Sequence, residues 1–175
     1  MKRNKKITLC AMMAALSTAV MLLSFFPYFI YAIPAVAGLF IMVAVIEIDC
    51  KWAFGTYLVS AILVFLLADP ESRLLYIFFF GYYPIAKALI ERIKNPIIEW
   101  PIKAVIFNTS VLLVYFVFAK MFGISMEEFG QWGKYGALAL LGLGNIVFIL
   151  YDIAVSRMAI FYFVVIQPKI KRIFK

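Results

Sequence analysis

The sequence contains no histidine and little charge: only 15% of its 175 residues are Asp, Glu, Lys or Arg. Soluble globular chains carry about 25% charged residues. The lack of histidine excludes Ser-His and Cys-His nucleophile pairs, H-E-x-x-H zinc sites and histidine proton relays. The two cysteines, Cys10 and Cys50, form no disulfide framework, and we expect both to be reduced thiols. Few enzyme chemistries remain, so we do not expect an enzyme.

Apolar residues are in large excess, at 66% of the chain. A water-soluble protein of this size has too little interior to bury so much apolar surface. The composition therefore predicts an integral membrane protein, with residues 1–175 forming a single domain.

Long apolar runs predict the membrane-spanning helices, since about 20 residues cross a bilayer. Residues 7–46 carry no charge and are too long for one crossing, so Pro27 and Pro34 mark a turn. We expect an all-α fold, a compact bundle of six transmembrane helices. The predicted helices cover residues 7–26, 34–48, 52–68, 74–90, 98–119 and, last, from near Lys134 to just before Pro168.

The basic residues predict the orientation. With six helices and the N-terminus inside, 13 of the 17 Lys and Arg fall on the cytoplasmic side. Both termini are therefore expected to be cytoplasmic. Because these charges flank the spans and form no soluble basic face, the net charge of +8 does not indicate nucleic-acid binding. The basic ends also suit contact with anionic membrane lipid.

The first predicted helix carries a strip of small residues: Ala11, Ala15 and Ala19 recur every four residues. Such strips let another helix approach closely in lipid. Two interpretations are open, a contact within the same bundle or a contact with a partner protein.

The segment AMMAALSTA, residues 11–19, follows a short basic N-terminus and resembles the A-x-x-x-A signature of the S components of energy-coupling factor (ECF) transporters. The resemblance implies that the three alanines pack on the membrane T component. Two cytosolic ATPases then hydrolyse the ATP, and this chain needs no cofactor of its own. The resemblance also implies a multi-pass protein of the bacterial cytoplasmic membrane. Such a protein binds a small micronutrient, usually a vitamin, near the outer face under the first loop.

Polar residues inside the predicted spans are candidates for either structure or binding, because they are costly in a membrane. Asn108 lies within the fifth helix, and Asn145 shares a face of the sixth with Asp152. Arg157 is a poor local partner for Asp152, and Lys87 of the fourth helix is one candidate. Hydrogen bonds between helices are the alternative to a ligand site.

Aromatic residues gather at the predicted outer ends. Most such residues anchor a helix at the interface, but tyrosines below it suit a pocket for a small flat heterocycle. The residues we single out as substrate-binding candidates are Tyr28, Tyr31, Tyr76, Tyr82, Tyr83, Asn108, Trp132, Lys134 and Asn145. No metal ligand set is evident.

The expected function is therefore the substrate-specific subunit of an ECF-type importer, which captures a vitamin-like molecule and docks to a T component and its ATPases. The alternative is a structural scaffold of the bacterial envelope or cell-shape machinery that resembles MreD. A ligand-sized outer pocket favours the importer, and a filled bundle favours the scaffold.

Overall fold

The computed structural model describes the backbone of residues 3–122 and 133–169 and, outside residues 27 and 118–140, their side chains. Regular structure in this part of the chain is entirely helical, which confirms the all-α prediction. The α-helices are α1 (Arg3–Met21), α2 (Ala32–Glu47), α3 (Cys50–Leu67), α4 (Pro70–Leu75), α5 (Tyr83–Ile90), α6 (Pro96–Phe122) and α7 (Gly133–Phe161). Short 3₁₀ or π segments are η1 (Leu22–Phe25), η2 (Pro27–Phe29), η3 (Tyr76–Phe80), η4 (Glu91–Ile93) and η6 (Tyr162–Ile166).

Five segments of the described chain are long and apolar enough to cross a membrane, and α2, with 16 residues, is shorter. Many large apolar side chains on these helices face outward, which suits a lipid environment and not water. The chain is therefore built as a multi-pass membrane protein. The five segments are Arg3–Phe25, Cys50–Leu67, Pro70–Ile93, Pro96–Val117 and Leu141–Lys169.

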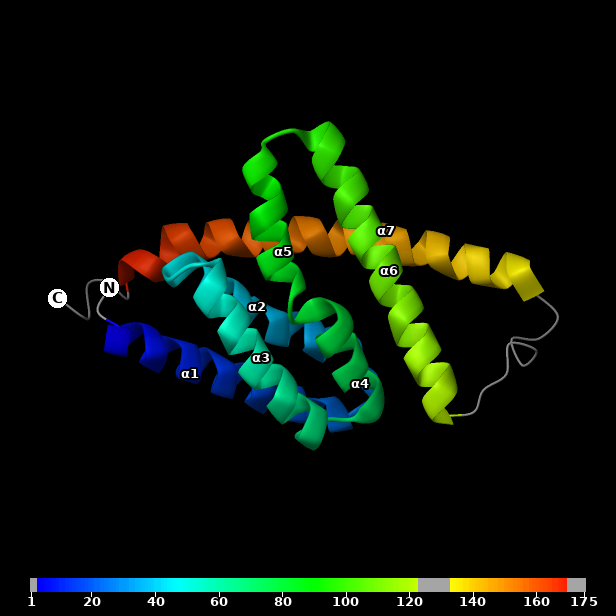
Figure 1. Ribbon diagram of the computed structural model, residues 1–175, viewed down its shortest axis with the longest axis horizontal. Helices are drawn as coiled ribbons and strands as arrows, with labels where there is room; N and C mark the ends of the chain where they lie inside the picture. The colour runs from blue at the N-terminus through cyan, green and yellow to red at the C-terminus, as the bar shows by residue number, and fades with distance from the viewer. Residues whose placement is uncertain (1–2, 123–132, 170–175) are drawn as a thin grey trace.

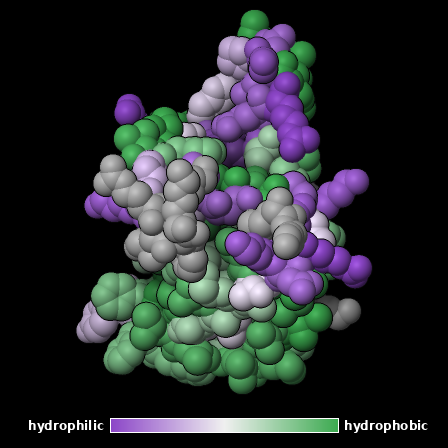
Figure 2. Space-filling model, turned by 90° about the vertical axis from the view of Figure 1, so that its left-hand side faces the viewer, coloured by the Kyte–Doolittle hydropathy of each residue, from purple (hydrophilic) through white to green (hydrophobic). Residues whose placement is uncertain are grey.

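The first and last described helices meet at one end of the molecule. The start of α1, the turn between α2 and α3 and the end of η6 lie together on the left of Figure 1. The Lys6 ammonium lies 3.8 Å from the Asp49 carboxylate. At the same end, Tyr162 and Gln167 each donate to Glu47 at 3.0 Å. Figure 2 looks onto this end, where hydrophilic residues form a band and continue to the tip of the α5–α6 hairpin at the top.

The predicted fourth helix, residues 74–90, is wrong as one continuous helix. The chain instead forms α4, the π-turn η3, a turn at residues 81–82 and α5 (Figure 1). Pro84 has no N–H to donate to the carbonyl four residues earlier, so the helix is interrupted there. The Gly81 N–H bonds to the Tyr76 carbonyl at 2.8 Å, and a Cβ at Gly81 would lie 2.8 Å from the Tyr57 ring.

The other helix boundaries agree with the prediction to within a few residues, except at the end of the last helix. Helical residues continue to 169, past Pro168, so the expected stop before this proline is wrong. The π-turn η6 precedes it, with the Gln167 N–H bonded to the Tyr162 carbonyl. We attribute the continuation to this turn, which widens the helix where the proline ring would otherwise meet a backbone carbonyl.

Among the described residues, two cores hold the helices together. The larger core lies among α1, α2, α3 and the interrupted segment Pro70–Ile93, which we call the broken span, and includes Met21, Ile41, Val64 and Ile85. The smaller core is aromatic and joins η3, α5, α6 and α7. There the Phe107 and Phe148 rings stack with centroids 4.7 Å apart. The helices α5 and α6 cross α7 near its middle (Figure 1), so this core lies at a crossing point.

Candidate functional site

The alanine strip of α1 faces away from the bundle. Ala11, Ala15 and Ala19 are exposed, whereas Ala14 and Thr18 beside them are buried against α2 and α3. Of the two open interpretations, a contact within the same bundle is therefore not what these three alanines make in the described chain. They leave small side chains on the outer face, beside the exposed Met12 and Leu16, and another helix can pack there.

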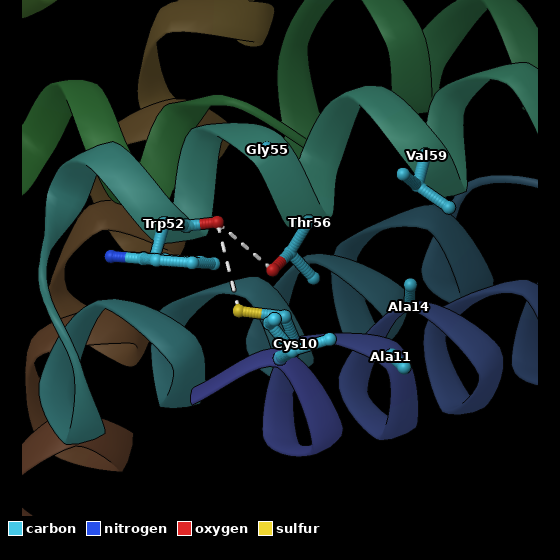
Figure 3. A pocket seen from close by; sticks show the side chains of 8 residues that line it. Cys10, Ala11, Ala14, Trp52, Gly55, Thr56 and Val59 are labelled. Carbon is cyan, nitrogen blue, oxygen red and sulfur yellow. Dashed lines mark hydrogen bonds between the residues drawn. The ribbon is translucent and has the colours of Figure 1, made fainter. Parts of the chain in front are cut away.

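A groove lies beside this strip, between α1 and α3 (Figure 3). Its volume is about 310 Å³, and its lining is almost entirely apolar. Its width follows from small side chains: a Cβ placed on Gly55 would meet nothing within 4 Å. The polar side chains at its wall are bonded to the backbone. Cys10 and Thr56 both donate to the Trp52 carbonyl, at 3.9 and 3.0 Å. The lining residues are Ile7, Cys10, Ala11, Ala14, Trp52, Gly55, Thr56 and Val59.

Tyr76 lies at the centre of a neutral hydroxyl cluster. Its hydroxyl lies 2.8 Å from the Ser17 hydroxyl of α1 and 2.7 Å from the Ser60 hydroxyl of α3. Ser17 also donates to the Ala37 carbonyl of α2, and Ser60 to the Tyr57 carbonyl. Ser17, Ser60 and Tyr76 have one hydroxyl proton each, but they make four contacts. Only three of these contacts can therefore be hydrogen bonds at any moment. We call Ser17, Ser60 and Tyr76 the hydroxyl cluster.

The neighbouring tyrosines stabilise the interruption of the broken span. Tyr57 of α3 donates to the Ile77 carbonyl within the π-turn at 2.7 Å. The Tyr82 hydroxyl lies 2.6 Å from the Ser110 hydroxyl of α6. Tyr57 and Tyr82 also pack edge to face, with ring centroids 6.2 Å apart. The Ile77 carbonyl of the π-turn is thus paired with a donor from another helix.

Asn108 of α6 and Asn145 of α7 bind one another. Each amide donates to the other's side-chain oxygen, at 3.2 and 3.1 Å. Each also donates to the carbonyl one turn earlier on its own helix, at 2.8 Å. All four donor hydrogens are therefore used within the chain, and the pair joins two helices.

A charge network forms where α5, α6 and α7 cross. Asp152 of α7 pairs with Lys87 of α5 through one oxygen and with Lys103 of α6, at 3.1 Å, through the other. The pairing of Asp152 with Lys87 is as predicted. The Tyr83 hydroxyl donates to the same carboxylate at 2.5 Å. The side chains of Lys87, Lys103 and Asp152 are each only 5% exposed.

Glu91 completes this network at its outer edge. A single oxygen, Glu91 Oε1, lies 2.9 Å from Lys87 Nζ and 3.0 Å from Lys103 Nζ. Its side chain is 43% exposed. Two ammonium and two carboxylate groups make the network neutral, which is the condition under which charges can be buried. We call Lys87, Glu91, Lys103 and Asp152 the charge network.

The sequence pattern did not indicate Lys103 or Glu91 as partners of Asp152, nor Ser17 and Ser60 as partners of Tyr76. The one available signal for a buried charge partner was that Lys103 lies within an apolar helix. Which residue it meets depends on how the helices cross, and one sequence does not contain that information.

The remaining substrate-binding candidates lie elsewhere or outside the described residues. Tyr28 and Tyr31, in the connection between α1 and α2, are 94% and 72% exposed. Trp132 and the side chain of Lys134 lie outside the described residues. Neither Tyr28 nor Tyr31 lines the groove between α1 and α3, and their role in binding stays a prediction.

Comparison of the chain with protein-family models, with curated proteins and with solved structures finds no match. The resemblance of residues 11–19 to S components therefore stays a prediction.

Proposed function

We propose that this chain is the substrate-binding membrane subunit of an ECF-type importer. It would capture a small vitamin-like heterocycle at the outer face of a bacterial cytoplasmic membrane. It would then dock through α1 to a T component, whose two cytosolic ATPases supply the energy. The chain itself would bind and dock without catalysing a reaction.

One observation carries this proposal: Ala11, Ala15 and Ala19 are exposed on the outer face of α1, and Ala11 also lines an apolar groove. Small residues on a helix surface let a partner helix approach closely, and close packing is what drives helix association in lipid. If these alanines packed inside the bundle, they could not contact a partner protein.

The docking step can be tested by Ala15→Trp. The indole would stand between α1 and a partner helix, so we expect association with a coexpressed T component to be lost. The matched control is Ala154→Trp, which places the same bulk on an exposed position of α7. Copurification is the measurement. Equal copurification of the Ala15→Trp and wild-type chains would contradict docking through this strip.

The substrate proposal needs its own test. Purified chain should be screened for thermal stabilisation by vitamins and nucleobase derivatives. Binding to the native state raises the melting temperature by mass action. We expect one heterocyclic class to stabilise the chain, and we expect Ala15→Trp to leave that stabilisation unchanged. No response to any heterocycle would contradict the substrate class.

A second candidate, the MreD-like envelope scaffold, is favoured by one observation. The polar groups of Tyr76, Asn108 and Asn145 are hydrogen-bonded to other groups of the chain. A scaffold needs such a satisfied interior, whereas a binding pocket needs polar groups free for a ligand. Identification of the copurifying membrane proteins separates the two: a T component with ATPases supports the importer, and envelope-synthesis proteins support the scaffold.

A further inference from the structure

The charge network has one member that differs from the other three. Lys87, Lys103 and Asp152 are 5% exposed and are supplied by α5, α6 and α7, whereas Glu91 is 43% exposed and comes from the short connection that follows α5. Of the four side chains, that of Glu91 is therefore the one that reaches the molecular surface.

Without the Glu91 carboxylate, Lys87 and Lys103 need one further negative charge. Asp152 neutralises one of the two ammonium groups, so a buried charge of plus one remains. Both Nζ atoms converge on a single oxygen of Glu91, at 2.9 and 3.0 Å. The site thus fits one anionic oxygen that bridges two lysines, and Glu91 occupies it as an internal ligand.

The surface around this edge combines positive charge with apolar side chains. Arg92 and Lys94 are exposed next to Glu91, and Ile97 and Trp100 are exposed where α6 begins. Figure 2 shows hydrophilic residues beside hydrophobic ones at this tip. Tryptophan and basic residues together are typical of the membrane–water interface, where lipid phosphates lie.

From these observations we propose that Lys87 and Lys103 form a binding site for a phosphate oxyanion, supplied by an anionic phospholipid, which takes the place of the Glu91 carboxylate. The phosphodiester brings the single negative charge that the network requires. Its acyl chains lie along the exposed apolar residues of the hairpin. This site is distant in sequence from the alanine strip of α1 and stands whether or not the chain is an importer subunit.

The test removes the internal competitor. In Glu91→Gln the lysines keep only Asp152, so the site has to take its second anion from outside. We expect the full chain in detergent to bind phosphatidylglycerol about fivefold more tightly than the wild type, the factor for one basic group near an anionic lipid. Native mass spectrometry during a lipid titration measures this, with phosphatidylcholine as the neutral reference.

The matched control is Glu99→Gln. Glu99 is on the same hairpin and takes part in no ion pair of the described chain, but its removal changes the net charge equally. We expect its lipid affinity to equal that of the wild type. In Glu91→Gln combined with Lys103→Met, the gain should disappear because the second lysine is gone.

A separate arm uses inorganic phosphate without lipid and follows the melting temperature. Stabilisation of Glu91→Gln by phosphate, with no preference for phosphatidylglycerol, would support the oxyanion site and assign its ligand to free phosphate. No gain in either arm, or an equal gain in Glu91→Gln and Glu99→Gln, would overturn the proposal.

Discussion

The hydroxyl cluster and the charge network each join helices in one half of the molecule, but they do so by different chemistry. Each joins three helices, and each receives one tyrosine from the broken span: Tyr76 on one side and Tyr83 on the other. The hydroxyl cluster is neutral, and its serines keep backbone partners of their own. The charge network is neutral only as a whole, because each ammonium depends on a carboxylate from another segment.

This difference predicts how the two regions respond to damage. Loss of one hydroxyl leaves the other polar groups paired, so the cost is that of a single hydrogen bond. Loss of one carboxylate leaves a buried charge uncompensated, and such a charge costs several kcal/mol. The C-terminal half should therefore be the more sensitive to single substitutions.

The largest effect is expected for Asp152→Asn. The side chain keeps its size but no longer compensates Lys87 and Lys103, so we expect a loss of about 3–5 kcal/mol in the free energy of unfolding. Equilibrium unfolding in mixed micelles measures it. The control is Ser156→Ala, which removes a hydroxyl that donates to the Asp152 carbonyl at 3.1 Å. A loss below about 1 kcal/mol for Asp152→Asn would show that the two regions do not differ as described.

An intermediate effect is expected for Gly38→Ala, which tests the contact between the two halves. A Cβ at Gly38 of α2 would lie 2.3 Å from the Phe80 carbonyl oxygen and 3.5 Å from the Tyr151 hydroxyl of α7. The backbone has to shift, at a cost of about 2 kcal/mol. Gly142→Ala is the matched control, because its Cβ would meet nothing within 4 Å. Equal stability of the two variants in the same unfolding assay would mean that the halves do not depend on this approach.

The smallest effect is expected for Tyr76→Phe. The ring stays buried and both serines keep their carbonyl acceptors, so one hydrogen bond is lost, at about 0.6–1.5 kcal/mol. Thermal unfolding beside the Asp152→Asn variant compares the two regions directly. A loss for Tyr76→Phe as large as that for Asp152→Asn would reverse the comparison.

The sequence predicted most helix bounds but not the contacts between the helices. Long apolar runs located the predicted helices, except the interrupted fourth one, to within a few residues, because lipid requires about 20 apolar residues per crossing. The interruption near Pro84 was signalled by that proline, yet the π-turn and the pairing of Tyr57 with Ile77 depend on how α3 lies beside it. Asn108 and Asn145 were recognised as polar residues of interest, and their mutual pairing depends on the crossing of α6 and α7.

The hydrogen bond between Tyr57 and the π-turn bears on how the chain enters the membrane. An unpaired carbonyl in hydrocarbon costs several kcal/mol, so the interrupted span is stable only where another helix supplies a donor. Tyr57 belongs to α3, which precedes residues 70–93 in the chain. Synthesis from the N-terminus therefore delivers the donor before the acceptor. Inserted without α3, the same residues would lack this donor, and we expect them to favour a straighter helix.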